Sequence, residues 1–173
     1  MLTTMLVVDL DRLERERRLA VEGEIDASGP DWALDGSSLV RLAVRLDVQL
    51  AGSDVVVLGE VSGELRTECR RCLADVGVEI RESLALAYQA GIDEAEAERR
   101  EVYVLPDRGW ELDLGPAVRE HVILAVPRFV LCSDACQGLC PRCGANRNEE
   151  SCGCGSREVD ERWGPLLRVL AGE

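Results

Sequence analysis

The chain has 173 residues, a length that suits one domain whose core needs no disulfides. Its 20 basic and 33 acidic residues give a net charge of −13, which disfavours non-specific binding of the whole surface to nucleic-acid backbones or anionic membranes. Aromatic residues make up 3% of the sequence, too few for rows of base-stacking platforms, and no apolar run has the length of a membrane span. We therefore expect a soluble, cytoplasmic protein that makes no membrane contact.

The first half of the sequence predicts one short segment of uncertain type followed by three strands. The Arg- and Glu-rich segment 10–19 fits a short surface helix or an ordered arm equally well. Apolar and polar residues then alternate over 40–50, 55–65 and 76–88, and this period of two is typical of half-buried strands. Three consecutive alternating strands joined by short turns predict an antiparallel meander.

The segments that follow predict a loop and a short hairpin. Residues 91–101 carry two Arg and five acidic residues without an apolar period, which indicates a mobile acidic loop. Segments 102–105 and 110–112 are joined by a turn-forming stretch that contains Pro106 and Gly109, and this arrangement predicts a hairpin.

A helix is predicted between Asp113 and Pro127. Asp113 can cap the helix, and proline is tolerated in the first turn at Pro116. The lone His121 lies on this helix and is a reserve metal ligand at best. Apolar side chains repeat at fourfold spacing along one side, which predicts that the helix packs on the sheet: Leu114, Val118, Val122 and Ala125.

Eight cysteines carry the strongest chemical signal in the sequence, and six of them lie between Cys132 and Cys154. Because the sequence has no secretory signal, a reducing compartment favours metal ligation over disulfides. Zinc takes four thiolates in a closed tetrahedral site, so eight cysteines fill two sites. A thioredoxin-like redox pair, structural disulfides and a catalytic zinc remain alternatives. The cysteines form four pairs: Cys69 with Cys72, Cys132 with Cys136, Cys140 with Cys143, and Cys152 with Cys154.

The spacing suggests how the pairs combine. Cys140-Pro-Arg-Cys143-Gly is a zinc-knuckle pattern, and the Cys152-Gly-Cys154 pair that follows closes a compact four-cysteine site. The remaining set is inferred from what is left: Cys69 and Cys72 at the tip of the hairpin between the second and third strands, with Cys132 and Cys136. A metal there constrains a long loop and contributes more to folding than a local knuckle.

Arginines near the cysteines reverse the global sign of the charge. The residues concerned are Arg66, Arg70, Arg71, Arg128, Arg142 and Arg147. They either neutralise the anionic four-thiolate zinc sites or also contact RNA phosphates. Since no Ser/His/Asp arrangement and no phosphate-binding glycine pattern is present in the sequence, we do not expect an enzyme or a small-molecule substrate.

The run from Leu131 to Asn148, closed by Cys152-Gly-Cys154, resembles the YceD family, the large ribosomal RNA subunit accumulation proteins of bacteria and plastids. The resemblance extends to the Cys69-Arg-Arg-Cys72 hairpin and to 113–127, and covers most of the chain from about Val40. It implies a non-enzymatic role in making or accumulating large-subunit ribosomal RNA. The sequence departs from the usual family ending at Glu161-Arg-Trp-Gly-Pro165.

Together these observations predict an α+β protein. We expect an antiparallel β-rich body with a packed helix over residues 1–126, a cysteine-rich zinc-binding module over 127–157, and an amphipathic tail over 158–173. The tail pattern consists of Trp163, Leu166, Leu167 and Leu170.

Two functions are expected ahead of the others. The first is a ribosome-biogenesis factor that contacts ribosomal RNA or its precursor through arginines near two zinc sites. The alternative is an acidic module that holds a basic ribosomal protein, with zinc purely architectural. A thiol redox switch is a third class, and it requires reversible oxidation of the cysteine pairs.

Overall fold

The computed structural model describes residues 6–29, 32, 37–106, 109–154, 161–163 and 168, apart from the side chains of Val40 and Glu161. The strands are β1 (Val7–Asp9), β2 (Arg18–Asp26), β3 (Ser37–Ala51), β4 (Asp54–Glu68), β5 (Asp75–Gln89), β6 (Tyr103–Val104) and β7 (Glu111–Asp113). The helices are α1 (Leu10–Glu16), α2 (Glu94–Arg100), α3 (Gly115–Ala125) and the 3-10 turn η2 (Glu161–Trp163).

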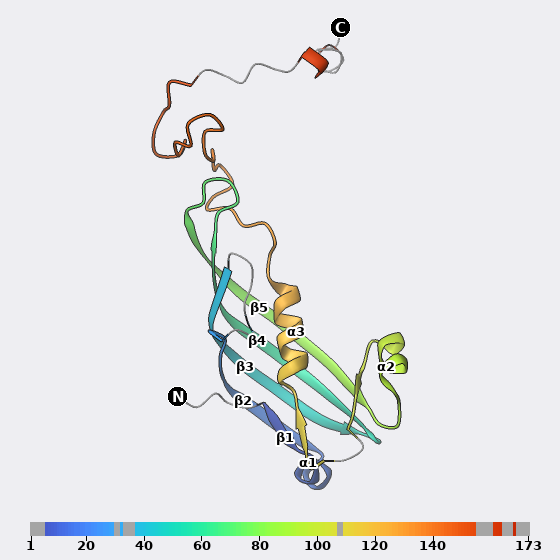
Figure 1. Ribbon diagram of the computed structural model, residues 1–173. Coiled ribbons are helices and arrows are strands. Elements are labelled where there is room, and N and C mark those ends of the chain that lie inside the picture. Colours follow the sequence, from blue (N-terminus) through green and yellow to red (C-terminus); the bar gives the residue numbers. More distant parts are fainter. Residues whose placement is uncertain are drawn as a thin grey trace.

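The body is a long twisted sheet in which β3, β4 and β5 form the antiparallel meander that the alternating pattern predicts (Figure 1). Each of these strands has 15 residues, and the sheet order is β2-β3-β4-β5-β6. The period of two sends alternate side chains to one face, where they are buried. On β4 these are Val55, Val57, Val61 and Leu65.

The buried face of the sheet is covered by α1, α3 and the small β1–β7 sheet, and the opposite face is open. Helix α3 lies along the covered face against β5 (Figure 1). Leu13 of α1 and Leu114 just before α3 are fully buried in the same core. The structure is therefore α+β, with an antiparallel meander and one short parallel strand pair.

Helix α3 confirms the helix expected after Asp113. Its buried side is formed by Ala117, Val118 and Val122. The helix begins at Gly115, and the Asp113 carboxylate accepts a 2.8 Å hydrogen bond from the Gly115 backbone N–H. Asp113 thus satisfies the first free N–H of the helix, although it lies one residue before the position of a standard N-cap.

The acidic segment 91–101 was expected to be a mobile loop, and this expectation is wrong. Residues Glu94–Arg100 form α2, because Asp93 caps the helix by accepting the Glu96 N–H at 2.8 Å. Glu96 pairs with Arg99 and Arg100 one turn later, and Ala97 is buried. The charged residues that suggest a solvated spacer in the sequence form ion pairs that stabilise a short helix.

The hairpin expected from 102–105 and 110–112 is also wrong. Strand β6 pairs in parallel with the end of β5, and β7 pairs antiparallel with β1. The two segments therefore join different sheets, because partners distant in sequence are available to each. Segment 10–19 forms α1 followed by β2, whose Leu19 and Ile25 are buried and whose alternation the sequence analysis missed.

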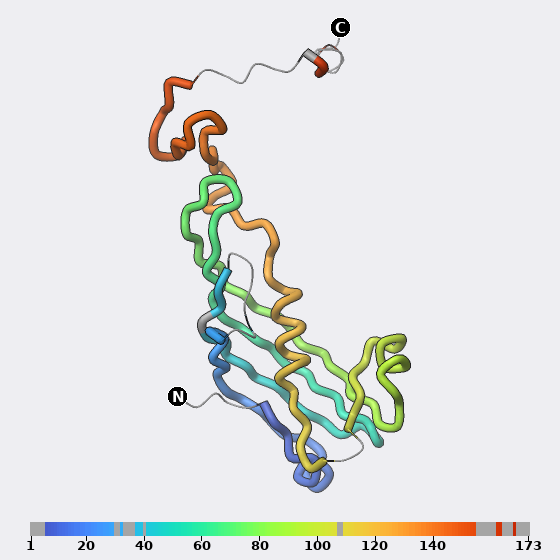
Figure 2. The backbone as a smooth tube through the Cα atoms, in the orientation of Figure 1, coloured from blue at the N-terminus to red at the C-terminus, as the bar shows by residue number. Residues whose placement is uncertain are grey.

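After α3 the chain continues to the β4–β5 turn, and Figure 2 shows these two segments side by side although they are far apart in sequence. Most of the expected tail 158–173 lies outside the described residues, so its amphipathic pattern is not tested. In the part of the chain described above, no helix combines the length and the apolarity that crossing a membrane requires.

Candidate metal centres

The β4–β5 turn holds Cys69 and Cys72 with their sulfurs on the same side. The Cys69 N–H donates to the Ala74 carbonyl at 2.8 Å, and the Leu73 N–H donates to the Cys69 carbonyl at 2.9 Å. Leu73 closes the turn with a φ of 60°. These backbone bonds shape the turn, and the Arg71 N–H also lies 3.5 Å from the Cys69 sulfur, so the turn holds the two sulfurs as a pair.

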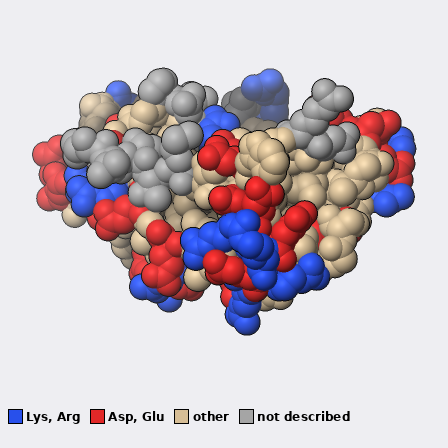
Figure 3. All heavy atoms as spheres, turned by 90° about the horizontal axis from the view of Figure 1, so that it is seen from below, with Lys and Arg blue, Asp and Glu red and all other residues tan. Residues whose placement is uncertain are grey.

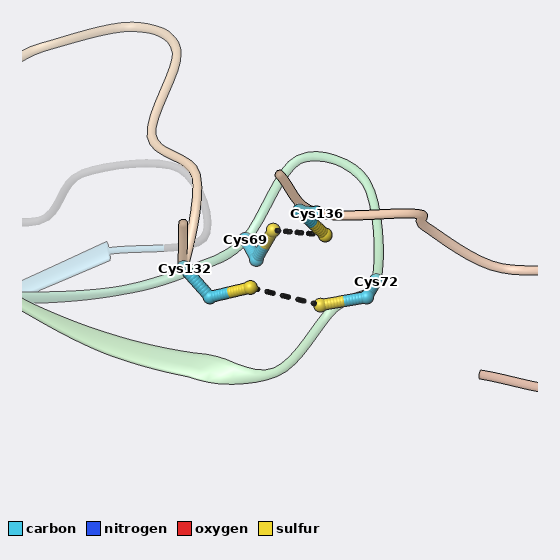
Figure 4. Close-up of side chains that lie close together, drawn as sticks. All are labelled: Cys69, Cys72, Cys132 and Cys136. Carbon is cyan, nitrogen blue, oxygen red and sulfur yellow. Dashed lines mark hydrogen bonds between the residues drawn. The ribbon is translucent and has the colours of Figure 1, made fainter. Parts of the chain in front are cut away.

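The segment after α3 docks on this turn through its backbone. The Arg70 N–H donates to the Val130 carbonyl at 2.9 Å, and the Leu139 N–H donates to the Arg71 carbonyl at 3.0 Å. The Arg71 guanidinium donates to the Cys136 carbonyl at 3.0 Å. Cys132 and Cys136 are thereby placed facing the turn cysteines (Figure 4).

These four residues form the inner cysteine cluster: Cys69, Cys72, Cys132 and Cys136. The sulfurs of Cys69 and Cys136 lie 3.8 Å apart and those of Cys72 and Cys132 lie 3.6 Å apart, and all four are within 4.8 Å of one another. Four sulfurs about 2.3 Å from a tetrahedral zinc ion are separated by about 3.8 Å. The inner cluster therefore has the dimensions of a closed zinc site, and all of its thiols are free.

Burial and charge distinguish the thiols of the inner cluster. Three of them are buried, and Cys132 is exposed. Burial opposes ionisation of Cys69, but the backbone N–H groups of Arg71, Cys132 and Cys72 outweigh it and lower the pKa of Cys69 to about 6. Hydrogen bonding with the Cys136 and Cys72 sulfurs raises the pKa of Cys132 to about 12. Four adjacent thiols cannot all ionise without a cation between them, and a divalent metal supplies that charge.

The outer cysteine cluster consists of Cys140, Cys143, Cys152 and Cys154, whose sulfurs also lie within 4.8 Å of one another. The knuckle is closed by the Gly144 N–H, which donates to the Cys140 carbonyl at 2.9 Å, and Gly144 has a φ of +77°. The backbone N–H groups of Cys143 and Arg142 lower the pKa of Cys140 to about 6. Only Cys140 is buried, so the outer cluster is more open to solvent than the inner one.

The structure thus brings the eight cysteines together in the two sets that the spacing suggests. His121 belongs to neither four-residue set. Two closed sets of four thiols, without a carboxylate or imidazole, match the donor chemistry of structural zinc, because catalytic zinc sites keep a position for water. That these sets bind metal stays a prediction.

Asn148 is a further residue of this region that the sequence analysis missed. Its side-chain nitrogen lies 3.5 Å from the Cys136 sulfur, and its side-chain oxygen accepts a 2.7 Å hydrogen bond from the Gln137 backbone N–H. Because Asn148 follows the outer knuckle, it ties the loop of the outer cluster to a sulfur of the inner one. Asparagine side chains in a short turn-forming segment commonly bind nearby backbone groups, and the Asn146-Arg147-Asn148 stretch after the knuckle was the available signal.

The six arginines singled out in the sequence all lie exposed at this end of the molecule or next to it. Arg66 is ion-paired with Glu64 at 3.4 Å, and Arg71 is bound to the Cys136 carbonyl. Arg70 and Arg128 line one small cavity together. Arg142 lies in the outer knuckle, and the Arg147 N–H donates to the Gly138 carbonyl at 3.0 Å.

The amino-acid sequence is similar to those of known proteins. An uncharacterised protein of Mycobacterium tuberculosis is 31% identical over 143 residues, which is 82% of this chain and 67% of the relative. An uncharacterised protein of Mycobacterium leprae is 29% identical over 150 residues, 82% of this chain and 68% of the relative. No solved structure matches the chain.

Two further comparisons carry a functional name. The chloroplastic large ribosomal RNA subunit accumulation protein YCED homolog 1 of Arabidopsis thaliana is 41% identical over 56 residues, 32% of this chain and 17% of the relative. The family model described as large ribosomal RNA subunit accumulation protein YceD matches residues 57–170. That stretch contains β5, α3 and all eight cysteines. The description of the family model supports a ribosome-related role. The chain therefore belongs to the YceD family.

Proposed function

We propose that this protein is a non-enzymatic ribosome-biogenesis factor that supports accumulation or processing of large-subunit ribosomal RNA. Each cysteine cluster holds one structural zinc ion, and exposed arginines at this end of the molecule contact phosphates of ribosomal RNA or its precursor. Family membership supports the ribosomal role. The distribution of paired and unpaired arginines supports the RNA contact.

Most described arginines of the body, though not Arg15, are ion-paired with neighbouring carboxylates. Acidic and basic side chains are interspersed in the view from below in Figure 3, at the end of the body away from the cysteines. The ion-paired arginines are Arg12, Arg18, Arg41, Arg45, Arg66, Arg81, Arg99 and Arg100. Such exposed pairs cancel charge locally and leave little to attract a polyanion.

The cysteine end differs, and this difference is the observation that carries the proposal. Among the described residues, the guanidiniums of Arg70, Arg128, Arg142 and Arg147 have no ion-pair or hydrogen-bond partner. The sulfurs receive their hydrogen bonds from backbone N–H groups and from Asn148 instead. No described guanidinium donates to a sulfur, so none of these four arginines is held in place by a hydrogen bond to a thiolate.

Zinc in both clusters provides the rigidity that such a surface needs. Metal analysis of the purified protein is expected to find about two zinc ions per chain, as two closed four-thiolate sites require. Protein that retains no zinc while remaining folded would contradict the architectural role of the metal.

RNA binding is tested by removing the four unpaired arginines together. The variant Arg70→Gln/Arg128→Gln/Arg142→Gln/Arg147→Gln is expected to bind single-stranded RNA more weakly, with a salt slope reduced by about 3, since each phosphate contact contributes about 0.7. The matched control replaces Arg18, Arg41, Arg45 and Arg81 and removes the same charge from paired positions. Equal losses in the two variants would contradict the proposal.

A second candidate function rests on the open face of the sheet. Two adjoining hollows of about 600 and 690 Å³ share Glu64 and Gly77. Glu64 lies directly opposite Glu79, and Glu68 opposite Asp75, and like charges in these positions destabilise a sheet. The carboxylates gathered here attract a basic partner, and this favours a module that holds a basic ribosomal protein. The net charge of −13 favours the same function.

The two candidates separate in one experiment. Glu68→Gln/Asp75→Asn is expected to weaken capture of an arginine-rich peptide while leaving single-stranded RNA binding intact. The four-arginine variant is expected to do the reverse.

A further inference from the structure

A small cavity of about 360 Å³ lies where three distant segments meet, namely the start of β3, the β4–β5 turn and the end of α3. Its volume is at the lower end of the range for ligand pockets, about 300–1,000 Å³. This size suits one planar ring with its attached groups and excludes a double helix. The lining residues are Ser37, Arg70, Ile123, Leu124, Val126, Pro127 and Arg128.

Cationic and apolar groups face this cavity together. Among the described residues that line it, Arg70 and Arg128 carry charge and none is a carboxylate. Both hollows on the open sheet face are lined by several carboxylates. Carboxylate-lined hollows are expected in a chain with a net charge of −13. In the described part of the chain neither guanidinium has a partner, so both charges are available to an anion.

The wall of the cavity is apolar, whereas a site that binds only an inorganic ion needs no apolar surface. Leu124 is 73% exposed although it lies in a helix with a buried side available, and the half-buried Ile123 and Val126 adjoin it. An inorganic anion would be recognised by the arginines alone. A ligand that uses both parts of the site carries a phosphate and a flat, weakly polar ring.

We infer that this cavity binds a single unpaired nucleotide of an RNA strand. The phosphate lies between Arg70 and Arg128, and the base packs on the wall formed by Ile123, Leu124 and Pro127. The inference rests on the proposed function and names the form of RNA that this site takes. Single-stranded segments and bulges expose such nucleotides, whereas in a duplex the bases are stacked and paired.

The inner cysteine cluster fixes the geometry of this site. Arg70 lies between Cys69 and Cys72, and its N–H is bonded to the carbonyl of Val130, two residues after Arg128. Both arginines are therefore anchored within a short distance along the chain of the same four sulfurs. The sheet, the helix end and the docked segment approach one another only in the folded protein.

The test compares a short single-stranded RNA with the same strand carrying abasic nucleotides. For wild-type protein the base-bearing strand is expected to bind more tightly. Leu124→Gln is expected to weaken binding of the base-bearing strand about tenfold, with an unchanged salt slope and little effect on the abasic strand. Arg70→Gln/Arg128→Gln is expected to weaken binding of both strands and to reduce the slope by about 1.4.

Matched controls are available because all three residues are exposed. Leu58→Gln makes the same change at a leucine on the open sheet face that is 45% exposed, and should bind RNA as wild type does. Equal binding of the base-bearing and abasic strands by wild type, or equal binding by the Leu124 and Leu58 variants, would overturn the inference. A free nucleoside monophosphate that binds as tightly as the strand would overturn it in favour of a small ligand.

Failure of this inference and failure of the proposed function give different results. If wild type binds neither strand, the proposed RNA contact fails and this site fails with it. If Arg142→Gln/Arg147→Gln weakens binding while the cavity variants bind as wild type, RNA contact stands and only the cavity assignment is overturned.

Discussion

The inner and outer cysteine clusters contain the same four donor atoms but occupy different places in the chain. The inner cluster joins cysteines 60 and 67 positions apart and connects the β4–β5 turn to the segment after α3. The outer cluster is confined to Cys140–Cys154. Three inner thiols are buried, whereas only one outer thiol is.

This comparison predicts that two equal sets of cysteines contribute unequally to the stability of the fold. Closing a long loop removes more conformational freedom from the unfolded chain than closing a short one. A metal in the inner cluster therefore stabilises the relation between sheet and module, while a metal in the outer cluster shapes its own loop.

Loss of one ligand should affect the two clusters very differently. Cys72→Ser is expected to lower the free energy of unfolding by about 3–5 kcal/mol, since a buried ligand and a long-range link are lost together. Cys143→Ser should lower it by less than about 1 kcal/mol, because the sheet keeps all of its contacts. Urea unfolding followed by circular dichroism in zinc-containing buffer measures both values. Equal losses would show that the clusters are energetically alike.

Gly138 tests the backbone contact that joins the module to the turn. Gly138 has a φ of +70°, and an added Cβ would lie 3.0 Å from the Arg71 carbonyl oxygen. Gly138→Ala is expected to cost about 2 kcal/mol in unfolding free energy, from backbone strain and displacement of the turn. Gly144→Ala is the control, because its φ is +77° but nothing lies within 4 Å. It should cost only the strain, about 1 kcal/mol.

Asn148 tests whether the outer loop supports the inner cluster. Asn148→Ala removes the donor to the Cys136 sulfur, and zinc affinity at the inner cluster is expected to fall about tenfold. Competition with a chromophoric chelator measures the change. Gln137→Ala serves as control, since only its backbone N–H takes part in this network. An unchanged affinity in Asn148→Ala would leave the two clusters independent.

Removal of metal from the wild-type protein is expected to have the smallest effect on the fold, at least in its first phase. A chelator added to the wild-type protein should release zinc in two phases, the outer ion first, because Cys143 is exposed and Cys152 and Cys154 are half-buried. The first phase should leave the circular dichroism of the sheet unchanged. A first phase that already unfolds the sheet would reverse the assignment.

Much of the fold follows from local pattern alone. The meander is readable because alternation over three long strands has a single interpretation once one face must be buried. Helix α3 is readable from its fourfold apolar repeat. The short elements were misread because two- or three-residue strands such as β6 and β7 carry too little pattern to reveal a distant partner. Helix α2 was misread because its stability comes from a cap and ion pairs, not from an apolar face.

The candidate site divides in the same way. Cysteine spacing predicted the two groups of four that the structure brings together, because a closed metal site needs four nearby thiols and short spacers restrict which pairs meet. The contact of Asn148 with the Cys136 sulfur and the cavity shared by Arg70 and Arg128 could be seen only in the folded structure. These contacts join segments distant in the chain, and their geometry depends on backbone bonds formed when the segments dock. Sequence periodicity reports the burial of a residue along its own element and contains no record of which other element lies across from it.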